Sequence, residues 1–205
     1  MRPTEMLMVE HRAIKQVLSC LGEMVRQTGK SGSLNRPMAE KVIDFIRNFA
    51  DTCHHGKEET HLFRMMEARG FSPYQGPTAV MRQEHDFGRD CVKQMVASVD
   101  GATAGEKASV KKFVDNATLF ADMLLSHIEK EDTRIYPMAN NTFSDDDQEE
   151  LMAAFHEVEK NLAPGTHEKY LQIADELADF YGVSKADHNA PIVCNDEMGC
   201  GGCGG

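Results

Sequence analysis

Apolar residues recur every three or four positions along most of this sequence, which is the period of a helix with one buried face. No stretch alternates convincingly between apolar and polar residues, as a half-buried strand would. The period predicts four long helices, at about residues 4–28, 36–69, 73–99 and 106–140. Short loops separate them. Long helices joined by short loops favour an up-down-up-down four-helix bundle.

The last third of the chain has a different character. Two shorter amphipathic segments begin near Ser144 and Thr166, and we expect them to form accessory helices on the outside of the bundle. The end of the sequence, residues 194–205, is too rich in glycine to hold a fixed fold unaided. We therefore predict an all-α protein with a four-helix bundle at 1–140, accessory helices at 141–183 and a flexible cysteine-bearing tail at 184–205.

Composition and charge narrow the functional classes. Of the 205 residues, 41% are apolar and 27% are charged, which is ordinary for a soluble globular protein. No apolar run approaches the roughly 20 residues of a membrane span, and the N-terminus lacks the continuous apolar region of a signal peptide. The net charge of −11 disfavours nucleic acid and anionic membranes as partners. We expect a cytoplasmic protein.

Every predicted bundle helix carries a histidine within its apolar stripe, and two helices add a glutamate four residues later. These residues are His11, His55, Glu59, His85, His127 and Glu131. Residues four apart lie on one helix face, so each His-x3-Glu pair presents an imidazole and a carboxylate to the same point. Buried carboxylates are costly unless they are paired or bound to a metal. Four such helices facing inward predict a site for two metal ions, and these ligands suit iron, manganese or zinc.

The second helix offers two registers, because His54 and Glu58 have the same spacing as His55 and Glu59. The positions in line with His55 are mostly apolar, whereas those in line with His54 are more polar. We therefore predict that His55 and Glu59 face the core and that His54 lies at its flank.

The order of these motifs resembles the hemerythrin-like (HHE) family, and the resemblance covers residues 1–140. The segments that carry it are Glu10-His11, Glu59-Thr60-His61-Leu62-Phe63, Glu84-His85 and Glu131-Asp132-Thr133-Arg134-Ile135-Tyr136-Pro137. The resemblance implies a non-haem centre of two iron ions joined by an oxo or hydroxo group. It also implies terminal ligands at His11, His55, His85 and His127, with Glu59 and Glu131 as bridges.

The chain departs from the oxygen-carrying members of this family. Arg89 stands one turn after His85, where they have a second histidine, and Asp132 beside Glu131 is a rival for the bridge. Four histidines, two carboxylates and a bridging oxygen would fill about ten of some twelve octahedral positions. The open positions, with room beside Gly88, favour binding or sensing of dioxygen, nitric oxide or peroxide. The alternatives are an oxidoreductase that consumes peroxide or nitric oxide with an electron donor, and an iron donor that repairs iron–sulfur proteins.

Cys194, Cys200 and Cys203 crowd the tail with the spacing C-x5-C-x2-C. Thiols at such spacings can hold zinc or iron, with His188 as a candidate fourth ligand, or can cycle as a dithiol. In a cytoplasmic chain, such a cluster suggests metal or redox chemistry before a disulfide framework. The sequence leaves open whether the tail forms a second metal or redox site or has no such role.

Overall fold

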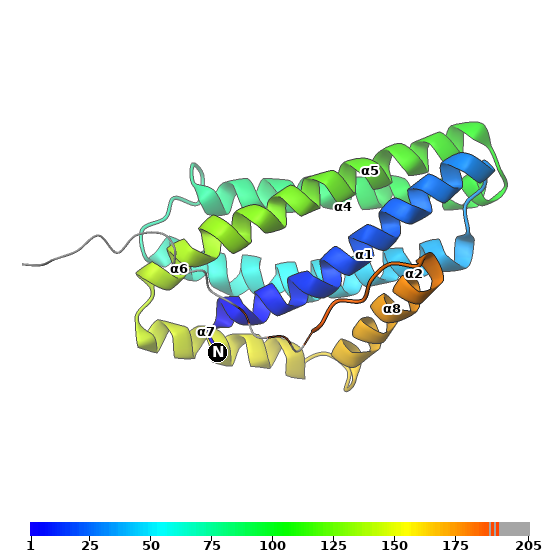
Figure 1. The fold of residues 1–205 in the computed structure, drawn as a ribbon. Coiled ribbons are helices and arrows are strands. Elements are labelled where there is room, and N and C mark those ends of the chain that lie inside the picture. Colours follow the sequence, from blue (N-terminus) through cyan, green and yellow to red (C-terminus); the bar gives the residue numbers. More distant parts are fainter. Residues whose placement is uncertain (189, 191, 193–205) are drawn as a thin grey trace, which may run out of the picture.

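The computed structural model describes residues 1–188, 190 and 192, and its regular elements in that range are all helices (Figure 1). The prediction of an all-α fold is confirmed. None of these helices combines the length and the apolar content that a membrane crossing needs. Cys194, Cys200 and Cys203 lie outside the described residues, so the site predicted there stays a prediction.

Four long helical rods run through the molecule. The first rod is α1 (Pro3–Ser31) and the third is α4 (Pro77–Thr103). The second rod consists of α2 (Arg36–Phe45), η1 (Ile46–His55), η2 (Glu58–Leu62) and α3 (Phe63–Ala68). The fourth consists of α5 (Lys107–Lys130), η3 (Glu131–Ile135) and α6 (Tyr136–Thr142). α4 packs along α5, and α5 also packs against α1 (Figure 1).

Local sequence signals set the ends of the helices. The side chain of Asn35 accepts a hydrogen bond from the backbone N–H of Met38 and so caps α2. Proline stands in the first turn of α1, α2 and α4, where its missing N–H costs nothing. α1 ends at Gly32, whose φ of 71° lies in the left-handed region that favours glycine.

Two further helices, α7 (Asp145–Lys160) and α8 (Thr166–Tyr181), follow the fourth rod. α7 begins with a capping box, in which the side chains of Ser144 and Asp147 each accept the other's backbone N–H. α8 packs against α1 and α2, whereas α7 packs against α1 and η2 (Figure 1). The two helices therefore cover one side of the rods.

Three segments of the second and fourth rods, η1, η2 and η3, are π-helical. A π-helix closes its hydrogen bonds over five residues instead of four, so the faces defined by the α-helical period shift. His55 ends η1, Glu58 begins η2 and Glu131 begins η3. The wider turns therefore help decide which of two neighbouring side chains faces inward.

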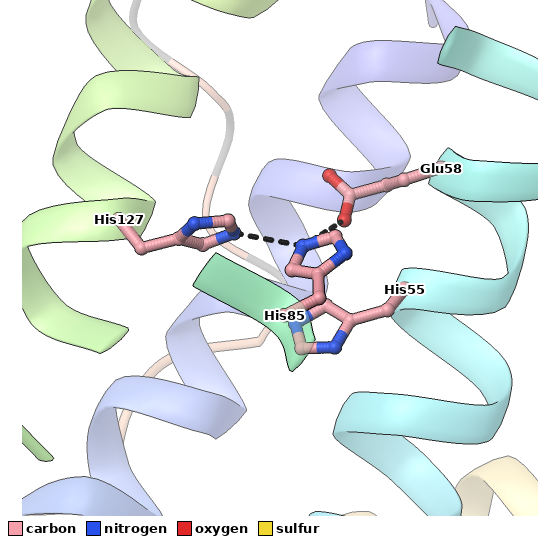
Figure 2. A group of neighbouring side chains, drawn as sticks. All are labelled: His55, Glu58, His85 and His127. Carbon is pink, nitrogen blue, oxygen red and sulfur yellow. Dashed lines mark hydrogen bonds and ion pairs between the residues drawn. The ribbon is translucent and has the colours of Figure 1, made fainter. Parts of the chain in front are cut away.

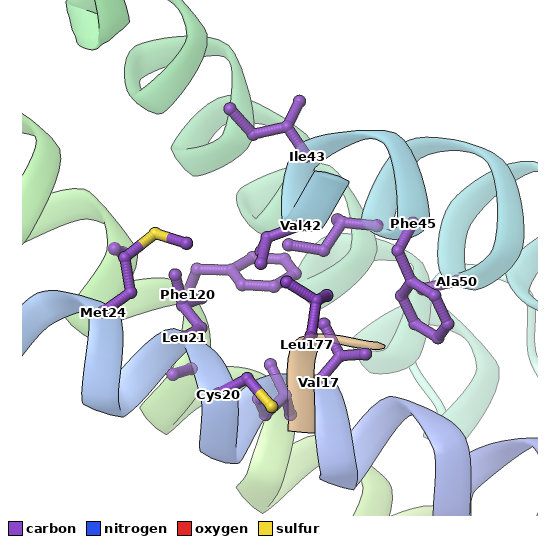
Figure 3. Close-up of a cluster of buried hydrophobic side chains, with 14 of the residues drawn as sticks. Val17, Cys20, Leu21, Met24, Val42, Ile43, Phe45, Ala50, Phe120 and Leu177 are labelled. Atoms are coloured by element: carbon purple, nitrogen blue, oxygen red, sulfur yellow. The ribbon is translucent and has the colours of Figure 1, made fainter. Parts of the chain in front are cut away.

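Buried apolar side chains form two clusters. The larger includes Val17, Leu21, Val42, Phe120 and Leu177 (Figure 3). The smaller includes Leu7, Phe63, Met81, Ile135 and Phe155. Leu177 of α8 and Phe155 of α7 are fully buried, so both accessory helices contribute to the core. Along α1, α4 and the fourth rod, a layer of polar residues stands between the two clusters, at His11, His85 and Glu131.

Candidate metal centre

Seven buried side chains from all four rods converge on this polar layer. They are His11 of α1, His54 and His55 of η1, Glu58 of η2, His85 of α4, His127 of α5 and Glu131 of η3. Each of them is at most 6% exposed. Histidine and glutamate are rarely buried together without a partner that compensates for their lost hydration.

The seven side chains form two groups that share one carboxylate. One group is His55, Glu58, His85 and His127, and the other is His11, His54, Glu58 and Glu131. Within each group, one ligand atom from every residue lies within 4.8 Å of the others. Figure 2 shows the first group, in which His85 lies between His127 and Glu58. Glu58 belongs to both groups, which makes it the natural link between two metal positions.

The inner imidazole nitrogens of the first and second rods face each other, as do those of the third and fourth rods. Nε2 of His11 lies 3.0 Å from Nε2 of His54, and Nε2 of His85 lies 3.0 Å from Nε2 of His127. The carboxylate of Glu131 spans the two pairs. Its Oε1 lies 3.0 Å from Nε2 of His127, and its Oε2 lies 3.3 Å from Nε2 of His11.

The outer nitrogen of each of these four histidines faces a carboxylate. The Nδ1 to oxygen distances are 2.7 Å for His11–Asp132, 2.9 Å for His54–Glu10, 2.6 Å for His85–Glu59 and 2.8 Å for His127–Glu84. A neutral imidazole that donates from Nδ1 has its lone pair on Nε2. Two lone pairs that face each other at 3.0 Å need a proton or a cation between them. Carboxylates in this position orient metal-binding histidines in many proteins.

The carboxylates themselves are incompletely satisfied. Oε2 of Glu58 and both oxygens of Glu131 are buried and have no hydrogen-bond donor among the described residues. Nδ1 of His55 is likewise buried without a hydrogen-bond partner. Buried polar atoms normally have partners, and unpaired carboxylate oxygens are especially costly. The donor set therefore fits two cations bound by nitrogen and oxygen ligands.

The charges of the two central glutamates support the same conclusion. Burial, followed by repulsion from Glu131, raises the pKa of Glu58 well above its usual value. Burial would also raise the pKa of Glu131, but attraction to the imidazoles of His127 and His11 outweighs it and lowers this pKa. In the absence of a cation, the pair therefore favours one charged and one neutral carboxyl group. Cations between them would allow both to ionise.

The site consists of two halves that repeat one sequence pattern, the first formed by the first and second rods and the second by the third and fourth rods. Segment Glu10-His11 corresponds to Glu84-His85, and residues 54–59 correspond to residues 127–132. In the first half Lys57 forms an ion pair with Glu10, and in the second half Lys130 forms one with Glu84. Each half thus supplies one histidine from each of its two rods, a shared glutamate and the acids that hold the imidazoles.

The pattern breaks at two positions, and the two groups differ as a result. His55 in the first half corresponds to Ile128 in the second, so one group has three histidines and the other has two. Tyr136 in the second half corresponds to Phe63 in the first. The Tyr136 hydroxyl donates to Oε1 of Glu58 at 2.6 Å and lies 3.3 Å from Nε2 of His11. The two-histidine group therefore has a phenol beside it.

The structure corrects the register predicted for the second helix. His54, expected at the flank, is buried beside His11, and Glu58 lies among the histidines in place of Glu59. The side chain of Glu59 is 26% exposed and binds Nδ1 of His85 and the guanidinium of Arg89. The prediction failed because it continued an α-helical period through η1 and η2.

The other predicted residues lie in or next to the site. His11, His55, His85, His127 and Glu131 belong to the two groups. Asp132, the rival of Glu131, contacts Nδ1 of His11 from outside. Sequence reasoning missed His54, Glu58 and Tyr136. The first two carried a signal, because 54–58 and 127–131 share the pattern His-x-x-Lys-Glu.

A buried lysine completes the surroundings of the site. Nζ of Lys57 lies 2.5 Å from Oε1 of Glu10 and 3.0 Å from Oε1 of Glu159 in α7. Burial would lower the pKa of Lys57, but the charge of Glu10 outweighs it and raises the pKa to about 12. Glu10, Glu159 and His167 form a further group of candidate ligands. The ammonium group already supplies the positive charge there, so we assign no metal to this group.

A pocket of about 290 Å³ reaches the three-histidine group from the surface. It lies between the second rod, α4 and α5, and its lining includes His55, His85 and Gly88. The rings of His55 and His85 stack there, with centroids 3.8 Å apart. Arg89, one turn after His85, also lines the pocket and forms ion pairs with Asp51 and Glu59.

Helical rods that direct histidines and glutamates to a common point are typical of metal-binding bundles. The model of the hemerythrin HHE cation-binding domain matches residues 2–139, which is more than half of the chain. The chain therefore belongs to the hemerythrin HHE cation-binding domain family.

Curated relatives add similarity but no assigned activity. Uncharacterized proteins of Mycobacterium bovis and of two Mycobacterium tuberculosis strains are each 24% identical over 155 residues. The match covers 76% of this chain and 60% of each relative, so the chain spans less than two thirds of their length. No solved structure matches the chain.

Proposed function

We propose that this chain is a non-haem di-iron protein, built as an up-down-up-down bundle, that binds or senses a small oxidant or gas such as dioxygen, nitric oxide or peroxide. The observation that carries the proposal is the pair of ligand groups that share Glu58. Oε2 of Glu58, both oxygens of Glu131 and Nδ1 of His55 are buried there without a hydrogen-bond partner among the residues that the structure describes, as expected of metal ligands. Imidazole with carboxylate is a suitable set for iron, although manganese and zinc accept it as well.

The groups assign each residue a role. His55, His85 and His127 would hold one iron, and His11 and His54 would hold the other. Glu58 and Glu131 would bridge the two ions, since each faces both histidine pairs. When bound, iron supplies the redox chemistry and the binding of a small ligand. The carboxylates at the outer nitrogens would accept from Nδ1–H, orient the imidazoles and leave each Nε2 directed into the site.

The structure brings five histidines to the site, one more than the four predicted from the sequence. Fewer coordination positions on the two ions would therefore stay free. Five nitrogens, four carboxylate oxygens and a bridging oxygen would fill about eleven of some twelve octahedral positions, against about ten for the set predicted from the sequence. The two-histidine position has the fewer protein ligands, so we expect a small ligand to bind there. Tyr136 places a hydroxyl group beside that position, 3.3 Å from Nε2 of His11.

The test is the metal content of protein purified without oxygen, together with its optical spectrum before and after dioxygen, nitric oxide or peroxide is added. We expect about two irons per chain and a spectrum that changes with at least one of these ligands. Zinc alone, no metal, or iron that responds to none of the three would contradict the proposal. A Glu58→Gln variant is the matched negative control, since its substitution removes the shared carboxylate.

A further inference from the structure

The pocket beside His55 and His85 is much larger than a diatomic ligand needs. Its volume of about 290 Å³ compares with roughly 30 Å³ for one water molecule in the liquid. It also lies against the three-histidine group, and its lining does not include His11 or His54 of the two-histidine group, where the small ligand is expected. A pocket of this size and place suggests a second, larger ligand.

The walls of the pocket are apolar. They are formed mainly by Ala50, Val92, Val96, Phe120, Met123 and Leu124. These side chains come from η1, α4 and α5, so three separate elements enclose the space. Apolar walls of this extent favour a hydrocarbon group, because burial of each methylene contributes to binding.

The outer end of the pocket is positively charged. Arg47 and Lys93 line the pocket and are exposed to solvent, so they lie at its open end. In the described part of the chain, neither forms an ion pair. Arg89 also lines the pocket, but its charge is compensated by Asp51, Asp86 and Glu59. An anionic group at this end would therefore meet two uncompensated cations on a protein that is otherwise strongly acidic.

We propose that the pocket binds an amphiphilic carboxylate, a medium-chain fatty acid in chemical class. Its carboxylate would lie between Arg47 and Lys93, and its hydrocarbon chain would follow the apolar walls toward His55 and His85. The pocket is formed by protein atoms alone, so this inference goes beyond the di-iron proposal and does not rest on it.

The experiment is calorimetric titration of the full chain with decanoate and with decanol, which has the same hydrocarbon chain but no charge. We expect saturable binding of one decanoate per chain. Arg47→Gln combined with Lys93→Gln should weaken decanoate binding by about tenfold or more and leave decanol binding unchanged. Lys107→Gln, an exposed charge outside the pocket, is the matched control and should bind decanoate like the original protein.

Substitutions that place larger side chains in the apolar wall of the pocket test the same proposal. Val96→Trp at the half-exposed rim and Ala50→Phe deeper inside should each weaken decanoate and decanol together. Circular dichroism identifies a variant that fails to fold, and the partly exposed Val96 accepts a larger side chain with less strain than the buried Ala50. Absence of saturable decanoate binding, or unchanged binding in a folded Val96→Trp variant, overturns the proposal.

Two further measurements distinguish binding of a fatty acid in the pocket from binding of iron and from binding to a membrane surface. Iron content measured on the same samples decides the di-iron proposal, whereas decanoate binding is expected with or without metal. If the protein co-sediments with vesicles of an anionic phospholipid but does not bind decanoate, the proposed fatty-acid pocket is wrong. Arg47 and Lys93 would then bind a membrane surface instead.

Discussion

The inner histidines owe their chemistry to the carboxylates behind them. Because His11, His54, His85 and His127 each present Nδ1 to an acid, each ring is held with Nε2 directed into the bundle. Burial and repulsion from His55 and His127 also lower the pKa of His85, which keeps it neutral. Its nitrogen can bind a metal without first releasing a proton. Burial would also lower the pKa of His127, but the charge of Glu131 outweighs it and raises this pKa to about 9, so a metal that binds there displaces a proton.

The neighbouring glutamates Glu58 and Glu59 should therefore differ sharply on substitution. Glu58→Gln removes the carboxylate that both ligand groups share, so we expect bound metal to fall from about two ions to below one per chain. Glu59→Gln removes the charged partner of His85 Nδ1 and of Arg89 but none of the residues in the two ligand groups, so both ions should remain while affinity falls about 10- to 100-fold. Elemental analysis gives the first quantity and competition with a chelator gives the second. If Glu59→Gln loses metal as completely as Glu58→Gln, the register predicted from the sequence is the correct one.

Tyr136 is the second residue whose role can be isolated. Tyr136→Phe keeps the ring that stacks on His11 but removes the hydroxyl that donates to Glu58. We expect the fold to persist and metal affinity to fall by about 10- to 100-fold, with a change in the optical spectrum of the bound metal. Tyr170→Phe is the control, since Tyr170 is equally buried but packs on Phe45 and Phe49, away from the ligands. Identical affinity and spectra in the original protein and Tyr136→Phe would rule out this role.

At the scale of the elements, the sequence predicted the helices well and the inward register less well. The rods begin and end within a few residues of the predicted helices, because amphipathic period and helix caps are local properties. The choice between His54 and His55 depends on η1, whose wider turns a period of 3.6 residues does not describe. In the structure both histidines are buried, in different ligand groups, an outcome that a choice of one face could not anticipate.

The position of Tyr136 at the site could not be predicted from the sequence for another reason. It contacts Glu58 and His11, which are far away in the sequence, and only the packing of the rods brings them together. Residue patterns along one helix predict a face of that helix, whereas a contact between three rods depends on their rotation and spacing.

The attachment of α7 should depend on pH in a way that can be measured. Arg69 of the second rod donates to the carboxylate of Asp147, and this interaction, with the backbone N–H of Ser144, lowers the Asp147 pKa from 3.8 to about 2. A carboxyl group whose pKa is lower in the folded state stabilises the fold above its unfolded value, and the contribution is lost as pH falls toward the folded value. Asp147→Asn should therefore reduce the free energy of unfolding at pH 7, and the difference should shrink between pH 4 and about 2.

The measurement is urea denaturation of metal-free protein at each pH, so that metal loss does not contribute. Asp145→Asn, in the same first turn of α7, is the control and should show a smaller effect, because Asp147 closes the capping box. A difference between the original protein and Asp147→Asn that is constant from pH 7 to pH 2 would show that the ion pair contributes nothing.

At the scale of the whole molecule, the candidate centre divides the core. Apolar clusters lie on both sides of the histidine layer, and every rod contributes a candidate ligand to that layer. Metal binding would thus connect all four rods at the level where apolar contacts are interrupted. In metal-free protein the same layer contains buried carboxylate oxygens without donors, which is unfavourable.

Removal of the metal should consequently lower the stability of the whole bundle. A metal that binds only the folded chain adds about 2.7 kcal/mol when its concentration is 100 times Kd, which for a chain of this length corresponds to a shift in Tm of about 5 to 11 °C. We expect calorimetry to show a loss of this order after chelation and its recovery when iron is restored. Glu58→Gln should show almost no change in Tm on chelation, because its ligand groups are already incomplete. An equal chelator effect in Glu58→Gln and the original protein would mean that the stabilising metal is bound outside the histidine layer, and the layer would then have to be stable through its hydrogen bonds alone.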